Sequence, residues 1–300
     1  MTAQTPHSSP TTQPIVVAVD GSSDGTRALD YAVTLASHGR HPLRLVHVPH
    51  ETLPLAVMLP LFASATVEEF GNRILSTAAT HARELDDSLV VEVVLARGPR
   101  AQTILDYATD AAAIVLGTRQ PSLHRVITGS TTTAVAAKAD CPVYCVPASW
   151  APARTSHRII AGVDGSGSSH QVLERAYAEA DQRGASLTVV HAWRPSDIYD
   201  HAIGTHQIET DWETCARRNL TELVAGRGER FPDLKVRLDL QYDWPATALE
   251  RATKDADLVV LGQRGHGGPL GLAIGSTARA LLRTGHCPVE IIPVEDEPPR

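Results

Sequence analysis

Short apolar runs alternate along the chain with longer segments whose apolar residues recur at helical spacing. In the second half, the runs fall near residues 158–164, 186–192, 235–241, 257–262 and 288–293. The segments between them predict helices near 168–182, 207–226, 245–255 and 276–284. Runs without polar alternation are typical of strands that are buried on both faces. The pattern therefore predicts an α/β fold, a doubly wound parallel sheet with flanking helices.

One long helix in each half is expected to pack an apolar stripe onto the sheet. In the first half the stripe comprises Val67, Phe70, Ile74, Ala78 and Leu85. In the second half it comprises Ile208, Trp212, Cys215, Leu220 and Leu223. We expect both stripes to face the core.

The two halves carry the same landmarks in the same order. The matched pairs are residues 15–22 with 159–166, 45–48 with 189–192, 114–117 with 259–262, 129–131 with 275–277, and 141–143 with 287–289. The offset drifts only from 144 to 146 residues, which indicates a tandem duplication. We expect a disordered tail at 1–13, a first domain at 14–149, a linker at 150–156, a second domain at 157–294 and a tail at 295–300.

Composition narrows the classes of function. A length of 300 residues suits two domains, and a net charge of −7 disfavours broad binding to nucleic acid or an anionic membrane. No signal peptide and no uncharged stretch of membrane-spanning length is present, so we expect a cytoplasmic protein. The four cysteines, Cys141, Cys145, Cys215 and Cys287, lack zinc-site spacing, and we expect them to be small buried core residues.

A glycine-rich loop at residues 261–277 is the strongest candidate for chemistry. Gly262 and Gly265 let the backbone approach a phosphate without an obstructing Cβ. A helix begins at Gly275–Ser276, where unpaired N–H groups and the helix dipole attract an anion. Arg264 adds a positive charge. The loop therefore predicts a nucleotide site, and the alternative is a glycine-rich connection without a ligand.

Several other polar residues are expected to lie near this loop. Asp164, His191 and Ala192 follow or end predicted strands, and the carboxyl ends of parallel strands meet at one edge. His191 and its counterpart His47 have the chemistry of general bases, but we expect them to pack and hydrogen-bond beside the pocket. No Ser/His/Asp constellation is recognisable, so we assign no catalytic residues.

Two other nucleotide motifs are excluded by the sequence. A phosphate-binding G-x4-G-K-[ST] loop is absent. The segment 165–170 follows a strand but lacks the last glycine of G-x-G-x-x-G, and Ser166 or Ser168 is expected to cap the next helix.

The spacing G-x2-G-x9-G-S at residues 262–276, the two Val-Asp-Gly-Ser segments and the two Cys-Pro-Val segments resemble the universal stress protein family. The chain looks like a tandem member over nearly its whole length. In that family this spacing marks members that bind ATP. The resemblance implies a five-stranded parallel sheet in each repeat, of the adenine nucleotide alpha hydrolase-like type, and pairing through the last strands, here near 143–147 and 288–293.

The resemblance also implies roles for residues of the second repeat. The phosphates of ATP, with Mg²⁺, would be lined by Gly262, Arg264, Gly265, Gly275, Ser276 and Thr277. Asp164 would meet the ribose or adenine side, and the backbone of Gly162 and Ala192 would surround the base. We identify no metal ligands on the protein itself.

The first repeat departs from this pattern. Gln120 replaces the second glycine of the motif. Only eight residues, 121–128, separate it from Gly129, which matches the third glycine. A side chain and a shorter loop should crowd the phosphates. The matching residues that remain are Asp20, Gly117, Arg119, Gly129 and Ser130. We expect ATP mainly in the C-terminal repeat, with weakened binding in the first repeat left open.

These patterns favour a regulatory, ATP-binding protein of the stress response. We expect an internal pseudo-dimer of repeats and a homodimer of chains. The alternatives are a slow ATP-hydrolysing or adenylyl-transferring enzyme on the same fold, and a nucleotide-free dimerisation module. Because no general base or acceptor site is recognisable, we expect at most a weak ATPase.

Overall fold

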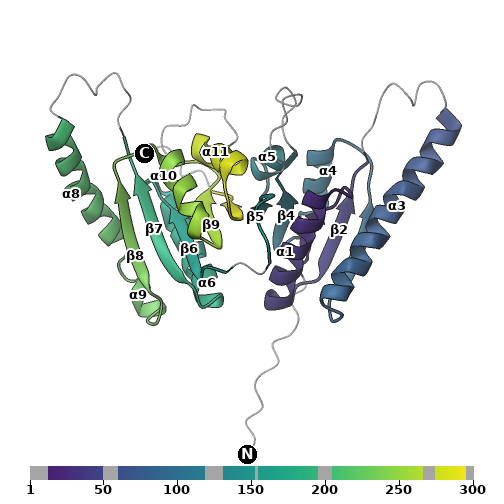
Figure 1. Ribbon diagram of the computed structural model, residues 1–300, viewed down its shortest axis with the longest axis horizontal. Helices are drawn as coiled ribbons and strands as arrows, with labels where there is room; N and C mark the ends of the chain where they lie inside the picture. The colour runs from purple at the N-terminus through teal and green to yellow at the C-terminus, as the bar shows by residue number, and fades with distance from the viewer. Residues whose placement is uncertain are drawn as a thin grey trace, which may run out of the picture. The chain divides into compact units, whose positions relative to one another are not determined.

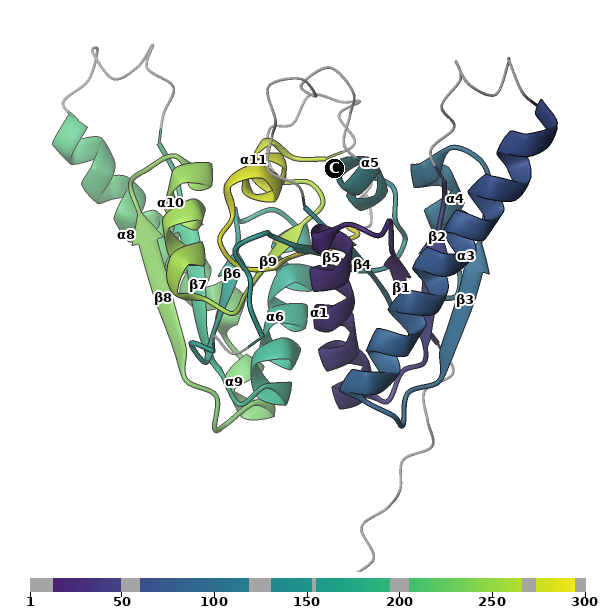
Figure 2. The same ribbon diagram turned by 45° about the vertical axis from the view of Figure 1, so that its right-hand side comes forward.

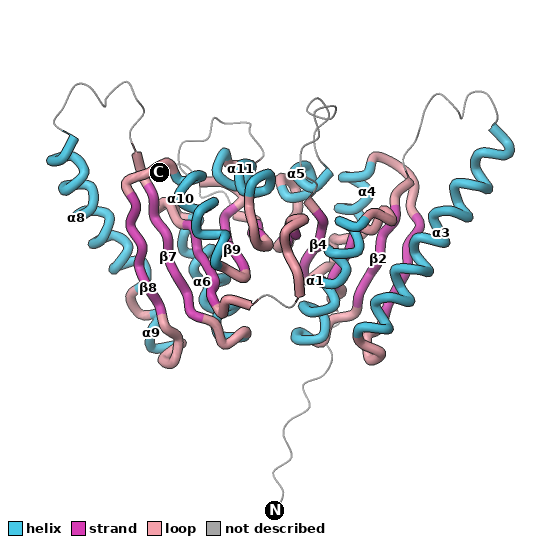
Figure 3. The backbone as a smooth tube through the Cα atoms, viewed as in Figure 1, coloured by secondary structure: helices cyan, strands magenta, loops and turns pink. Residues whose placement is uncertain are grey.

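The computed structural model describes residues 13–49, 60–118, 131–152, 155–194, 205–265 and 274–294. By its internal contacts the chain divides into two compact units, Met1–Gly117 and Thr118–Arg300. Helices alternate with strands along both units, as Figure 3 shows, and the predicted α/β class is confirmed. Within the described residues, no helix combines the length and apolar content that a membrane span requires.

The first unit contains a parallel four-stranded sheet. Its strand order is β3 (Val91–Leu95), β2 (Leu43–His47), β1 (Ile15–Ala18) and β4 (Ala113–Gly117). Two long helices, α1 (Ser23–Gly39) and α3 (Pro60–Leu85), contact each other and pack on this sheet (Figure 1). The short helix α4 (Arg100–Asp106) joins β3 to β4.

The second unit contains a six-stranded sheet. Its order is β5 (Val143–Val146), β10 (Val289–Ile292), β9 (Leu258–Gly262), β6 (Arg158–Gly162), β7 (Ser186–Ala192) and β8 (Val236–Gln241). Only β5 and β10 pair antiparallel, and these are the last strands of the two repeats. The predicted pairing of the last strands is therefore confirmed.

The helices of the second unit follow the sequence prediction closely. They are α5 (Thr131–Ala136), α6 (Ser168–Gln182), α8 (Thr205–Val224), α9 (Arg227–Arg230), α10 (Pro245–Ala252), the 3₁₀ turn η1 (Thr253–Asp255) and α11 (Ser276–Thr284). Helices α10 and α11 lie side by side (Figure 2).

The core of each sheet is built from aliphatic strand residues. Ile159, Ile160, Leu187 and Leu258 are completely buried. Burial of each such side chain contributes about 1.5–3 kcal/mol to folding. The apolar runs therefore supply the main stabilisation and place the polar strand ends at the edge of the sheet.

The prediction of which α3 residues face the core is wrong, because the buried residues lie about one position along the chain from the expected ones. Val67, Phe70 and Leu85 are exposed, whereas Gly71, Leu75, Ala79 and Ala82 are buried. The cause is a close approach of α3 to the sheet. A Cβ built on Gly71 would lie 2.6 Å from Leu95 Cδ1 and 3.2 Å from the His47 ring. Only a small residue fits there, and Phe70 is consequently turned outward.

The expectation for Cys215 is also wrong, both as a core cysteine and as a member of the α8 stripe. Its side chain is exposed, and Ala216 and Leu220 are the buried residues of this helix segment. Residues four apart share a helix face, whereas Cys215 is rotated about 100° from Ala216. Cys145 and Cys287 are buried as predicted, and burial raises the pKa of Cys287 to about 12. The side chains of Ile208 and Trp212 lie outside the described residues.

Candidate functional site

Asp164 follows β6 and organises the turn into α6. Its Oδ1 atom accepts hydrogen bonds from the Ser166 backbone N–H (3.0 Å), the Ser166 hydroxyl (2.6 Å) and the Ser169 hydroxyl (3.2 Å). Its other oxygen faces the glycine loop, because a Cβ built on Gly265 would lie well inside 3.0 Å of Asp164 Oδ2. The strand-end carboxylate and the second glycine of the loop are therefore in direct contact.

The serines after Asp164 do not cap α6 as predicted. The helix has Gly167 at its N-cap position and no side-chain capping bond. The Ser166 hydroxyl instead donates to Asp164, since an ionised carboxylate is a stronger acceptor than the alternatives nearby. Ser168 Oγ lies 2.7 Å from Ser166 Oγ and 3.4 Å from the Arg264 carbonyl. These serines thus link the turn to the glycine loop.

The two ends of the glycine loop close on each other. Gly262 ends β9, and the Gly275 N–H donates to the Gln263 carbonyl at 2.9 Å. A Cβ built on Gly275 would lie 3.8 Å from Arg264 Cα and 4.0 Å from Gly265 N. Ser276 and Thr277 form the first turn of α11. The structure therefore brings Gly265 and Gly275 together beside Asp164, and Ser276 and Thr277 follow directly in the chain. Residues 266–273 lie outside the described part of the chain.

Gly162 and Ala192 occupy the neighbouring strand ends. A Cβ at Gly162 would come closest to Leu261 Cδ2 and would lie 3.0 and 3.2 Å from the methyl carbons of Leu249, so a larger residue there would displace these side chains. Ala192 is buried at the end of β7. Their predicted contribution to a base-binding site stays a prediction.

The strand-end histidines hydrogen-bond to the neighbouring strand end, as expected. His191 Nδ1 lies 2.9 Å from the Val163 carbonyl, and His47 Nδ1 lies 2.7 Å from the Val19 carbonyl. Each carbonyl can only accept, so Nδ1 carries the proton in both rings. Each histidine therefore fixes the backbone next to an aspartate turn.

Gln263 is a buried polar residue at the start of the glycine loop that the sequence analysis did not single out. Its side chain is buried, and its amide donates to the Ala136 carbonyl at the end of α5 at 2.9 Å. The available signal was a polar residue placed directly after a buried strand. The bond ties the start of the glycine loop to a helix of the first repeat.

The first repeat conserves the aspartate turn. Asp20 Oδ1 accepts hydrogen bonds from the Ser22 backbone N–H (3.0 Å) and hydroxyl (2.5 Å). Ser22 also caps α1, since its hydroxyl accepts from the Gly25 N–H. A Cβ at Gly117 would lie 2.5 Å from the Asp24 carbonyl oxygen. The other loop residues, Arg119, Gln120, Gly129 and Ser130, lie outside the described residues.

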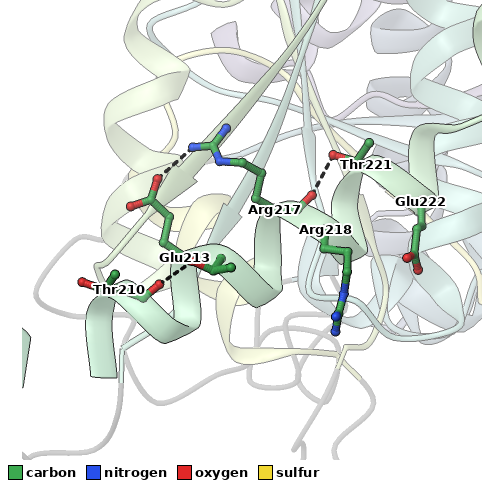
Figure 4. A pocket seen from close by; sticks show the side chains of 7 residues that line it. Thr210, Glu213, Arg217, Arg218, Thr221 and Glu222 are labelled. Carbon is green, nitrogen blue, oxygen red and sulfur yellow. Dashed lines mark hydrogen bonds and ion pairs between the residues drawn. The ribbon is translucent and has the colours of Figure 1, made fainter. Parts of the chain in front are cut away.

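Neither of two surface hollows is lined by these residues. Figure 4 shows the larger hollow, which follows the outer face of α8 beside the Glu213–Arg217 ion pair. The other hollow is lined mainly by α6 residues. In the described ranges, no three His, Cys, Asp or Glu side chains gather to hold a metal ion. The aspartate turn and the glycine loop stay the predicted ligand site.

The model of the universal stress protein family matches residues 11–147 and again residues 155–293. The chain belongs to the universal stress protein family. A universal stress protein of Mycobacterium tuberculosis is 30% identical over 284 residues, covering 92% of this chain and 95% of the relative. One of Mycolicibacterium smegmatis is 31% identical over 291 residues, covering 93% and 96%.

A solved universal stress protein structure shares the fold of this chain. The crystal structure from Archaeoglobus fulgidus superposes with a TM-score of 0.72 over 94% of this chain and 97% of the other, at 18% identity. Both repeats of this universal stress protein therefore follow the family's fold, and the aspartate turn and glycine loop lie at the carboxyl edge of its parallel strands.

Proposed function

We propose that this universal stress protein binds ATP with Mg²⁺ in its C-terminal repeat, and that nucleotide occupancy regulates it in a cytoplasmic stress response. The observation that supports the proposal most directly is the contact between Gly265 and the Asp164 carboxylate beside the start of α11. An acceptor for ribose hydroxyls and a phosphate-accessible backbone lie within one site.

The proposed ligand fits the chemistry of these residues. The first N–H groups of α11 have no partner within the helix, and the helix dipole favours an anion there. Arg264 adds positive charge, and Asp164 presents a carboxylate toward the loop. Mg²⁺ is commonly held through the phosphates themselves with few protein carboxylates, which suits a site whose described residues include no acidic cluster.

The proposal extends to the arrangement of the chain. Its repeats span residues 14–149 and 157–294, and the first repeat binds ATP weakly or not at all. Chains associate as a homodimer. Regulation requires that two conformations of the protein differ in affinity for ATP, because a ligand shifts only such an equilibrium.

Direct measurement of the bound nucleotide tests the proposal. Mass spectrometry of the denatured purified protein should identify an adenine nucleotide, and isothermal titration should give one ATP site per chain. Gly265→Ala should weaken ATP binding about 100-fold, or about 2.7 kcal/mol, because its Cβ collides with Asp164.

Gly228→Ala is the matched control. No atom in the described part of the chain lies within 4 Å of a Cβ built there, so folding and ATP affinity should remain unchanged. A protein that purifies without nucleotide and shows no ATP-dependent thermal shift would overturn the proposal. Steady release of ADP by the wild type but not by Gly265→Ala would instead favour an ATPase.

A further inference from the structure

A buried polar network joins the last strands of the two repeats to α6. Arg175 Nε donates to Glu290 Oε1 at 2.5 Å, and its Nη2 atom lies 2.5 Å from the Tyr144 hydroxyl and 2.6 Å from Glu179 Oε1. The Tyr144 hydroxyl donates to Glu179 Oε1 at 2.8 Å. Arg183 holds the other Glu179 oxygen at 2.6 Å. Tyr144 comes from β5 and Glu290 from β10.

The two strand residues of this network occupy equivalent positions in the repeats. Tyr144 and Glu290 are 146 residues apart, which is also the offset between Cys141 and Cys287. In the antiparallel register they lie directly opposite each other, flanked by the pairs Val289–Cys145 and Ile291–Val143. The approximate two-fold axis that relates β5 to β10 therefore passes between Tyr144 and Glu290.

A residue on a two-fold axis faces its own copy when identical strands pair. Pairing of β10 with a second β10 in this register would place two Glu290 carboxylates opposite each other, at a position with 0% exposure. Like charges opposite each other destabilise a strand pair, and buried charges are costly without full compensation. Glu290 Oε2 already has no hydrogen-bond partner among the described residues.

The other homotypic pair fails for a different reason, because Arg175 and Glu179 lie on α6 of the second repeat and would be absent from it. Pairing of β5 with a second β5 would place Tyr144 opposite Tyr144. The hydroxyl would then lack the arrangement in which it both accepts from Arg175 and donates to Glu179. Tyr144 therefore keeps both of its hydrogen bonds only when β5 pairs with β10, and only this pairing leaves Glu290 without a second carboxylate opposite it.

We propose that the Tyr144–Glu290 pair and its bridge to Arg175 and Glu179 make β5 and β10 selective for each other and exclude pairing of either strand with its own copy. The last strand of each repeat then pairs only with the last strand of the other repeat. Association of chains then uses other surfaces. Buried polar groups that fix one pairing over another are a well-attested device in other folds.

Cleavage of the folded full chain tests this selectivity. A protease site is introduced in the linker near residues 151–156, and the purified protein is cut after folding. Native mass spectrometry then distinguishes the N-terminal half paired with the C-terminal half from each half paired with itself. A second sample labelled with ¹⁵N is mixed in, so that the appearance of mixed-label pairs shows that the halves have exchanged.

In the wild type, pairs of one N-terminal half with one C-terminal half should exceed pairs of identical halves at least tenfold after exchange. Glu290→Tyr places tyrosine at both positions and should bring the species toward the statistical 1:2:1 distribution. Tyr144→Phe removes only the hydroxyl and should relax the selectivity partly, which keeps the test available if Glu290→Tyr fails to fold. Ile291→Val, a neighbouring change in the same strand pair, should keep the wild-type distribution.

A statistical distribution in the exchanged wild type would overturn the proposal. The same conclusion follows if Glu290→Tyr, folded by circular dichroism, and Tyr144→Phe both remain as selective as the wild type.

Discussion

The two repeats end their first strands with the same aspartate turn, yet the surroundings of the turns differ. In the first repeat a Cβ at Gly21 would lie 3.2 Å from the Ile74 side chain of α3. In the second repeat a Cβ at Gly165 would meet no atom of the described residues within 4 Å. Both glycines have a left-handed φ, +76° and +79°, so the local backbone is conserved. The turn alone therefore does not make a site, because the neighbouring elements determine whether it is accessible.

The strands β4 and β9, which are the fourth strands of the two repeats, also differ in the space around their last residues. Gly117 approaches the Asp24 carbonyl of α1, and a Cβ there would lie 2.5 Å from that oxygen. At Gly262 the nearest contacts of a Cβ would be the Arg264 carbonyl oxygen at 3.0 Å and Val294 Cγ1 at 3.3 Å. The first repeat is closed tightly by backbone at this point, whereas the second retains more room.

The largest expected effect is therefore on stability at these two glycines. Gly117→Ala should destabilise the protein by about 2–3 kcal/mol, because a helix backbone cannot move away cheaply. Gly262→Ala should cost about 1 kcal/mol or less. Urea denaturation followed by circular dichroism measures both. Equal losses in the two variants would contradict the difference in packing.

The general fold was predictable because its signals are local and repeated. Aliphatic runs such as 158–162 and 258–262 became strands within two residues of the expected bounds. The order of landmarks also predicted the β5–β10 pairing, through the resemblance to the family. Burial of a strand on both faces leaves an unmistakable pattern in the sequence.

Details that depend on contacts between elements were not predictable. Gly71 is buried on α3 because Leu95 and His47 come close to it, and helical periodicity alone placed Phe70 there instead. At the candidate site, the glycine spacing indicated the loop, but nothing in the sequence showed that Gln263 would bond to Ala136. Such partners are separated by many residues and leave no periodic signal.

A second contrast between the repeats is the pair of equivalent residues Tyr144 and Glu290. Complete burial raises the pKa of Glu290 to about 7, against the opposing effect of the Arg175 guanidinium. In the unfolded chain this carboxyl ionises near 4.5, so unfolding above that pH releases a proton. The contribution of Glu290 to stability is therefore complete below pH 4.5 and is lost as the pH rises to about 7.

Glu290→Gln isolates this dependence because it cannot ionise. The free energy of unfolding of the wild type, relative to this variant, should fall by about 2–3 kcal/mol between pH 4.5 and pH 7 and become level above that range. Chemical denaturation at half-unit pH intervals measures the difference. A difference that is constant across this range would show that Glu290 ionises at its usual pH when folded.

The smallest expected effect is the difference in ATP affinity between variants of Asp164 and of Asp20. Asp164→Asn keeps Oδ1 as the acceptor for Ser166 and Ser169 but replaces the charged Oδ2 that faces Gly265. Under the proposed function it should weaken ATP binding about tenfold, which is about 1.4 kcal/mol and typical of a hydrogen bond to a charged group. Asp20→Asn makes the same change in the first repeat and should leave the affinity within about twofold.

Isothermal titration of both variants under identical salt conditions measures this difference. The matched chemistry of the two substitutions removes any general effect of lost negative charge on nucleotide binding. Equal weakening by both would mean that each repeat holds ATP. Weakening by Asp20→Asn alone would place the nucleotide in the first repeat. The space beside Gly165 in the second repeat would then not be a path for the ligand.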